Sequence, residues 1–235
     1  MPSATSSRPR IVRAPAEIVL VRHAVSTANE KGILAGRDNS VHLSEKGQRQ
    51  ADLLADALLA VKVTGVYSSP IKRCRETMQP YLKSSPLTLT PLPGVQEMDY
   101  GKWSGRRLAT LSKLPLWSSI QRKPSSVRFP DGESFNEMAA RAIEAITSVA
   151  VAGKTVVVCS HGDVIKSLVA SALGLHLDQF QKIVIDPASI TKLRFHNNDF
   201  TVVSVNDTHH LASLVVDAQK SKRGRGHLLG GGSGL

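Results

Sequence analysis

The chain has 235 residues, 41% hydrophobic and 21% charged, which suits a globular protein with a full core. No apolar run approaches the roughly 18 residues that a membrane span needs, so we expect no membrane association. The net charge of +11 suggests a nucleic-acid ligand, but over half of this excess positive charge lies in residues 1–15 and 217–235. Aromatic residues, which could stack on bases, make up only 4% of the chain. We therefore expect no nucleic acid as primary ligand.

The two ends of the chain differ in composition from the middle. Residues 1–15 are rich in Ser, Pro and Arg and predict a disordered basic leader, whereas residues 213–235 predict a flexible, basic, Gly-rich tail. One folded domain is expected over 16–212. The leader has no apolar centre of the kind a signal peptide needs, and the two cysteines are too few for a disulfide framework. We therefore expect a cytoplasmic protein.

The middle of the chain alternates between two kinds of pattern. Short apolar runs predict strands at 18–21, 63–67, 155–159, 189–196 and 200–205, with a brief extended piece at 95–100. Helical spacing predicts helices over 44–61, from Pro70 to before Ser84, over 134–151 and over 163–173, with helical fragments in 106–130. This alternation predicts an α/β fold with a mostly parallel sheet and helices on both faces.

The two clearest strands each end in a histidine. Arg22-His23 follows the run 18–21, and Ser160-His161-Gly162 follows 155–159. Because parallel strands bring their carboxyl ends to one edge of the sheet, where open α/β folds bind ligands, both histidines are expected at one site. The small polar residues after His23, among them Ser26 and Asn29, suit the wrapping of an anion.

These residue types fit phosphoryl transfer. An unprotonated nitrogen of His23 would be the nucleophile toward phosphate, and Arg22 and Arg73 would grip the phosphate while keeping the imidazole neutral by repulsion. His161 would donate to the same phosphate. A carboxylic acid beside a phosphate dianion has its pKa raised, so Glu97, with Asp99 as the fallback, is the candidate acid.

Several short motifs resemble one protein family, the histidine phosphatase superfamily, which includes cofactor-dependent phosphoglycerate mutases. Arg22-His23 with Ser26 and Asn29 is similar to its Arg-His-Gly-x-Thr/Ser-x-x-Asn signature. Further blocks match in the same order along residues 17–210: Ser68 to Cys74, Glu97 to Gly105, Gly132-Glu133-Ser134 and Ser160-His161-Gly162. The Arg73-Cys74 pair and the run from His161 to Lys166 resemble a phosphatase branch with actinobacterial members.

The resemblance implies a fold, a reaction and a set of site residues. The fold is a three-layer α/β/α sandwich with a mostly parallel sheet, and the reaction is metal-independent phosphomonoester hydrolysis through a phosphohistidine, without a cofactor. His23 would be phosphorylated and Glu97 would serve as proton donor and later as the base for water. The phosphate pocket would comprise Arg22, Ser26, Asn29, Arg73, His161 and Gly162.

Some positions depart from the family pattern. Ala24 replaces a glycine, which the loop tolerates if its φ stays negative, and Val25 replaces a frequent glutamate, which removes a polar contact. Asp163 follows Gly162 where a small residue is frequent, and could cap a helix or approach a substrate. Trp103 and Trp117 are interpreted as packing residues rather than as platforms for a substrate.

Two other functions are left open by the sequence. A phosphoglycerate mutase would usually carry a longer insert, whereas here Gly132 follows Glu97 by only 35 positions. Six cations nonetheless leave room for an anionic substrate: Arg106, Arg107, Lys113, Arg122, Lys123 and Arg128. A catalytically silent binding protein is the other alternative, but it would have no chemical need for all five candidate residues: Arg22, His23, Arg73, Glu97 and His161. A small phosphate ester is the expected substrate, while a phosphoprotein substrate and a homodimer are left open.

Overall fold

A computed structural model describes residues 14–214 of the chain. The predicted leader at 1–15 and tail at 213–235 lie almost wholly outside the described residues, so the domain boundaries at 16 and 212 stay a prediction. None of the helices in the described range is long and apolar enough to cross a membrane.

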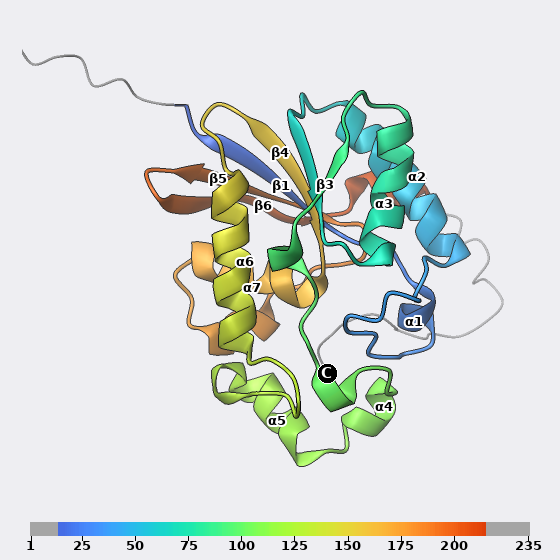
Figure 1. Ribbon diagram of the computed structural model, residues 1–235, viewed down its shortest axis with the longest axis vertical. Coiled ribbons are helices and arrows are strands. Elements are labelled where there is room, and N and C mark those ends of the chain that lie inside the picture. Colours follow the sequence, from blue (N-terminus) through green and yellow to red (C-terminus); the bar gives the residue numbers. More distant parts are fainter. Residues whose placement is uncertain (1–13, 215–235) are drawn as a thin grey trace, which may run out of the picture.

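The centre of the molecule is a six-stranded sheet in the order β3-β2-β4-β1-β5-β6 (Figure 1). Parallel pairing joins β3 to β2, β2 to β4 and β4 to β1, whereas β5 and β6 are antiparallel additions at one edge. The strands are β1 (Ala16–Arg22), β2 (Gly65–Ser68), β3 (Leu89–Pro91), β4 (Thr155–Ser160), β5 (Ile190–His196) and β6 (Asp199–Asp207). This mixed sheet confirms the predicted α/β class.

Helices cover both faces of the sheet and make the three layers that the sequence predicts (Figure 1). One layer contains α2 (Glu45–Leu59) and α3 (Lys72–Lys83), and the other contains α6 (Phe135–Val149) and α7 (Gly162–Ala172). In β1, Val19 and Val21 pack in the apolar cluster with α2 and α3, while Ile18 and Leu20 pack in the cluster with α6 and α7. A strand buried on both faces has to be apolar at every position, which explains its unbroken run.

Local signals for helix ends act as expected. The Ser44 side chain accepts from the Gly47 N–H at the start of α2, and Ser134 and Glu137 form the predicted capping box at the start of α6. Gly174, in the left-handed region at φ +64°, follows the end of α7. Helix α3, by contrast, begins at Lys72, so Pro70 lies before its first turn.

One part of the chain differs from the sequence prediction, and another, at 189–205, forms its predicted strands as an antiparallel pair. The piece predicted as extended, 95–100, forms no strand; a short 3-10 turn covers Pro93–Val95 instead, and the neighbouring strand is β3. β5 and β6 form an antiparallel hairpin whose turn residues, Asn197 and Asn198, both have positive φ. Asparagine tolerates the left-handed region that such a tight turn requires.

A smaller unit lies below the carboxyl edge of the sheet. It contains α4 (Leu108–Leu111) and α5 (Pro115–Arg122), shown at the bottom of Figure 1. Trp103 stacks on Trp117 with 6.5 Å between ring centroids, and Phe129 meets Trp103 edge-on at 5.4 Å. The excursion at 106–130 therefore contains the predicted helical fragments, held by an aromatic cluster.

Gly47 allows helix α2 to approach the loop after His23, and we expect Gly47→Ala to destabilise the fold. A Cβ at this position would lie 1.9 Å from the Val25 carbonyl oxygen, although alanine normally favours a helix. Thermal unfolding should show a loss of about 1–3 kcal/mol, as for overpacked cores. Asp52→Ala, at an exposed position of the same helix, is the control and should unfold as the wild type does.

Candidate active site

His23 lies at the carboxyl end of β1 and is 3% exposed. Its Nδ1 lies 2.8 Å from the carbonyl oxygen of Ala24, which can only accept, so Nδ1 carries the proton. The Arg73 Nε–H points at His23 Nε2 across 3.2 Å, which requires a lone pair on Nε2. Burial, and then the charges of Arg73 and Arg22, lower the pKa of His23 well below its usual range. The ring is therefore neutral, and Nε2 is the ring nitrogen that carries the lone pair.

Arg73 extends from the first turn of α3 and is 2% exposed. Besides His23, its guanidinium donates to the carbonyl oxygen of Gly36 at 2.8 Å and to His161 Nδ1 at 3.1 Å. Its Nη2 also lies 3.9 Å from a carboxylate oxygen of Glu97. The one guanidinium thus touches a histidine from each of two strands, a loop carbonyl and the candidate acid.

Arg22 occupies the last position of β1 and donates to the Ile185 carbonyl oxygen. The glycine at 162 makes room for it, because a Cβ there would lie 3.3 Å from the guanidinium. Two buried nitrogens, Arg22 Nε and Arg73 Nη1, have no hydrogen-bond partner within residues 14–214. Buried N–H donors are normally paired, so these two suit the oxygens of a bound anion.

His161 precedes α7 and is fully buried. Its Nδ1 accepts from Arg73, and its Nε2 lies 2.8 Å from the Ser69 hydroxyl and 3.4 Å from the Cys74 sulfur. Burial is the main reason that its pKa is far below the usual range, followed by the charge of Arg73. Both ring nitrogens are thus engaged, and the ring holds Arg73. Its predicted donation to phosphate stays a prediction.

Glu97 lies in the segment after the turn Pro93–Val95, with its side chain 11% exposed. Burial first, and the charge of Asp163 second, raise the pKa of Glu97 to about 7, and Arg73 opposes this shift. Its Oε2 lies 3.7 Å from His161 Nδ1. The carboxyl group can therefore exist in both protonation states near neutral pH, as an acid that later serves as a base requires.

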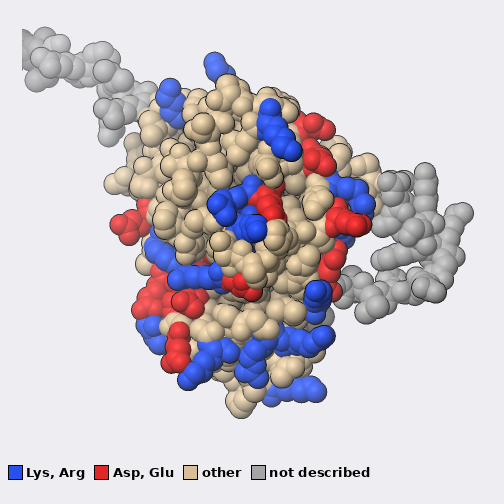
Figure 2. Space-filling model, turned by 45° about the vertical axis from the view of Figure 1, so that its right-hand side comes forward, with Lys and Arg blue, Asp and Glu red and all other residues tan. Residues whose placement is uncertain are grey.

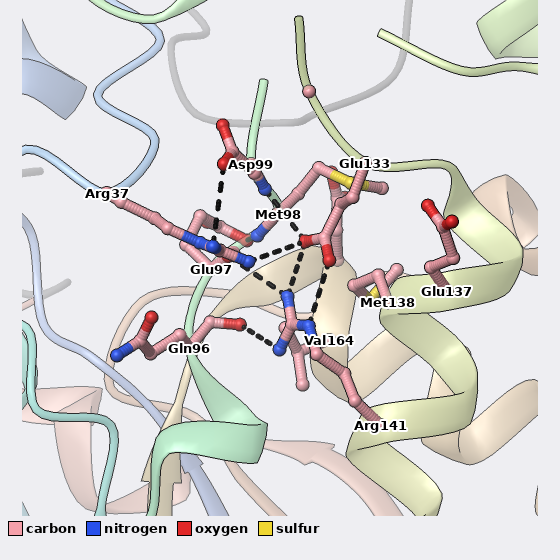
Figure 3. A network of polar contacts seen from close by, with 12 residues as sticks. Arg37, Gln96, Glu97, Met98, Asp99, Glu133, Glu137, Met138, Arg141 and Val164 are labelled. Atoms are coloured by element: carbon pink, nitrogen blue, oxygen red, sulfur yellow. Dashed lines mark hydrogen bonds and ion pairs between the residues drawn. The ribbon is translucent and has the colours of Figure 1, made fainter. Parts of the chain in front are cut away.

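The backbone of Glu97 is fixed by two arginines. Its carbonyl oxygen accepts from Arg37 at 3.0 Å and from Arg141 at 3.1 Å (Figure 3). Glu133 joins the network by accepting from both arginines and from the Asp99 N–H at 2.8 Å. The Gly-Glu-Ser motif therefore positions the acid-bearing segment. Asp99, the fallback acid, points to Arg37 with 42% of its side chain exposed.

A cavity of about 480 Å³ opens between the sheet edge and the unit of α4 and α5. The predicted residues Arg22, His23, Arg73, Glu97 and Gly162 line it, and so do Ser26 and Asn29. These last two form a capping box on α1 (Thr27–Glu30), so the Ser26 hydroxyl donates to Asn29 instead of pointing freely at a ligand. Their role as phosphate ligands stays a prediction.

The remaining departures from the family pattern have local explanations. Ala24 keeps a negative φ, as expected for a tolerated replacement of glycine. The Val25 N–H donates to Gln50, a different polar contact from the one that a glutamate side chain would make. Asp163 lies on the cavity wall and accepts from the Tyr100 hydroxyl at 2.8 Å.

Four contributing residues were not assigned a role from the sequence: Gly36, Ser69, Arg37 and Arg141. Their contacts connect segments far apart in the chain, so local spacing offered no signal for Gly36 or the arginines. Ser69 lies inside the Ser68 to Cys74 motif, and its place before Pro70 is the signal that the sequence offers. Within residues 14–214, no group of three or more His, Cys, Asp or Glu side chains could hold a metal ion.

The arrangement matches a known family. Residues 18–208 match the family model of the histidine phosphatase superfamily (branch 1). The chain belongs to this superfamily. The sequence is 30% identical over 209 residues to phosphoserine phosphatase 1 of Hydrogenobacter thermophilus, covering 87% of this chain and 99% of that protein. It is also 26% identical to a probable phosphoglycerate mutase GpmB of Proteus mirabilis, covering 86% of this chain and 97% of that protein.

Solved structures of other proteins share the fold. The YhfR protein of Bacillus stearothermophilus superimposes with a TM-score of 0.77 at 25% identity, over 83% of this chain and 98% of that one. A mycobacterial glucosyl-3-phosphoglycerate phosphatase in complex with VO3 superimposes with a TM-score of 0.75 at 23% identity, over 82% of this chain and 100% of that one. The protein is a phosphomonoester hydrolase of the histidine phosphatase type, which confirms the predicted reaction class.

The charge of Asp163 should control the protonation of Glu97. Asp163→Asn removes a negative charge that raises the pKa of Glu97, so the midpoint of that carboxyl should fall from its value of about 7. The amide oxygen can still accept from Tyr100. Carbon NMR of labelled Glu97 would measure the midpoint. Asp99→Asn, at the exposed neighbouring carboxylate, is the control; an equal shift in both variants would contradict the assignment.

Proposed function

We propose that this chain hydrolyses small phosphate monoesters in two steps, with His23 as the nucleophile. In the first step, His23 Nε2 attacks phosphorus, the bond to the ester oxygen breaks, and protonated Glu97 gives its proton to the leaving alcohol. In the second, the Glu97 carboxylate takes a proton from water as the water oxygen attacks phosphorus. Inorganic phosphate leaves, and Nε2 recovers its lone pair.

The observation that carries this proposal is the fixed tautomer of His23. The Nδ1–H bond to Ala24 leaves Nε2 unprotonated, with its lone pair accepting from Arg73 Nε. His23 lines the cavity together with Arg22 and Arg73, each of which has one buried nitrogen without a partner among residues 14–214. Phosphate oxygens next to Arg22 Nε and Arg73 Nη1 would accept hydrogen bonds from these two donors. Charge that spreads over the phosphoryl oxygens in the transition state would meet the same fixed positive groups.

A small molecule suits this site better than a phosphoprotein or nucleic acid. His23 is only 3% exposed and lies in the cavity, so a phosphoryl group on a short side chain of a folded protein would have to enter past the unit of α4 and α5. The two buried, unpaired thiols of Cys74 and Cys159 support a reducing compartment, and we place the enzyme in the cytoplasm. Whether it forms a homodimer stays a prediction.

Phosphoglycerate mutase activity is a second candidate, because relatives such as GpmB carry that name. A phosphoglycerate needs a cation for its carboxylate in addition to those that hold the phosphate. All six cations that the sequence offered between 106 and 128 are exposed, and none of them lines the cavity. The geometry therefore favours the phosphatase.

Replacing His23 by alanine should abolish turnover without unfolding the protein. Phosphate release from 4-nitrophenyl phosphate, measured in excess chelator, is expected for the wild type and absent for His23→Ala. His176→Ala, which changes an exposed histidine on another segment, should keep the wild-type rate. A normal rate in His23→Ala would refute the mechanism, and loss of activity in chelator would refute its independence of metal.

Replacing Glu97 by glutamine should slow the hydrolysis of esters in proportion to the basicity of their leaving groups. We expect kcat to fall by about 10²–10⁴-fold for an alkyl phosphate, and far less for 4-nitrophenyl phosphate. Because Glu97 must be protonated and its pKa is about 7, wild-type activity on the alkyl ester should decline above pH 7. That decline should be absent in Glu97→Gln; its persistence there would assign the ionisation to another group.

A further inference from the structure

The wall of the cavity formed by the α4 and α5 unit is largely apolar and aromatic, with Ser112 and Gln121 as its polar members. Trp103, Trp117 and Phe129 lie there together with aliphatic side chains from α4, α5 and the loop after α1: Ile33, Leu34, Leu108 and Ile120. Trp103 is buried and packs on Phe129, whereas Trp117 is half-buried and Leu108 is 36% exposed. The two tryptophans, interpreted from the sequence as packing residues, thus pack against each other and also form the wall.

Charges in the cavity are distributed unevenly. Among the described residues that line it, the cations are Arg22 and Arg73, and both lie at the phosphate end. The acids in the same lining are Glu30, Glu97 and Asp163. Lys166 is buried near Asp163 and donates to Gln181, but it is not part of the cavity wall. A carboxylate on the organic part of a substrate would lose water and meet a largely apolar wall that offers no cation among its described lining residues.

The basic side chains of the α4 and α5 unit add no cation to the described cavity lining. Figure 2 shows blue side chains gathered over the lower end of the molecule, where α4 and α5 lie in Figure 1. These cations are exposed to solvent and lie outside the cavity lining, as for Arg107 and Arg122. Because these side chains are exposed to water and salt, their attraction for a carboxylate in the cavity is screened.

From this wall we propose that the enzyme selects phosphate esters whose organic group is uncharged and largely apolar, with Trp117 and Leu108 as specificity-determining residues. The inference rests on the proposed function, since it names the substrate class of the same site. A volume of about 480 Å³ falls within the usual range for small-ligand sites, so an aromatic or branched aliphatic group fits beside the phosphate. Aromatic rings gain from contact with the tryptophan faces, whereas a buried unpaired carboxylate costs free energy.

The test compares two esters that differ only at the far end of the alcohol, 2-phenylethyl phosphate and 2-carboxyethyl phosphate. Both have primary alkyl leaving groups, so the chemical step makes similar demands and the ratio of kcat/KM reports on the wall. We expect at least about tenfold preference for the phenyl ester, the scale that pocket contacts can supply. Affinity of both esters for His23→Ala, measured by calorimetry, should follow the same order.

Two substitutions locate the selectivity. Trp117→Ala should lower kcat/KM for the phenyl ester about tenfold while leaving the inhibition constant of inorganic phosphate unchanged. Leu108→Lys should raise activity on the carboxyethyl ester by placing a cation at the wall. Leu59→Lys is the control, because Leu59 is similarly exposed, at 46%, on helix α2 away from the cavity.

The outcomes separate this inference from the function on which it rests. Turnover that depends on His23 but favours the carboxyethyl ester would overturn the inference and keep the phosphatase. Tighter binding of the phenyl ester without turnover of any ester would overturn the proposed function and keep the inference about the ligand. An equal response of both esters to Trp117→Ala would show that this side chain does not select between them.

Discussion

The site depends on the burial of one guanidinium, that of Arg73, among groups that accept from it. A buried arginine cannot lose its charge, so its surroundings must supply acceptors, and here these are His23 Nε2, His161 Nδ1 and the Gly36 carbonyl oxygen. Each contact constrains a different segment. The tautomers of both histidines follow from it, because a group that only donates requires lone pairs on the atoms facing it.

The protonation of Glu97 shows how burial and charge are balanced around this cation. Burial and Asp163 favour the neutral acid, Arg73 favours the carboxylate, and the outcome is a pKa of about 7. The supporting network of Arg37, Arg141 and Glu133 holds the backbone of the acid and does not touch its carboxyl oxygens. Position and protonation are thus set by separate groups, which allows each to be altered without the other.

The fold and the reactive residues could largely be predicted, because both leave local signals in the chain. An unbroken apolar run followed by Arg22-His23 indicates a buried strand with a ligand edge, and Ser134 with Glu137 marks a helix start. Contacts between distant segments leave no such signal, so the antiparallel edge, the role of Gly36 and the engagement of His161 required the structure. The basic residues of 106–130 show the same limit: their composition left room for an anionic substrate, whereas their side chains lie outside the cavity lining.

The central claim, that His23 Nε2 carries the phosphoryl group, is tested most directly by trapping the intermediate. Glu97→Gln, mixed with labelled 4-nitrophenyl phosphate and quenched in alkali within milliseconds, should retain phosphate on a single peptide containing His23. The label should be stable to base and labile to acid, and phosphorus NMR should place it on Nε2. Phosphate on Nδ1 or on another residue, or turnover without any trapped label, would contradict the account.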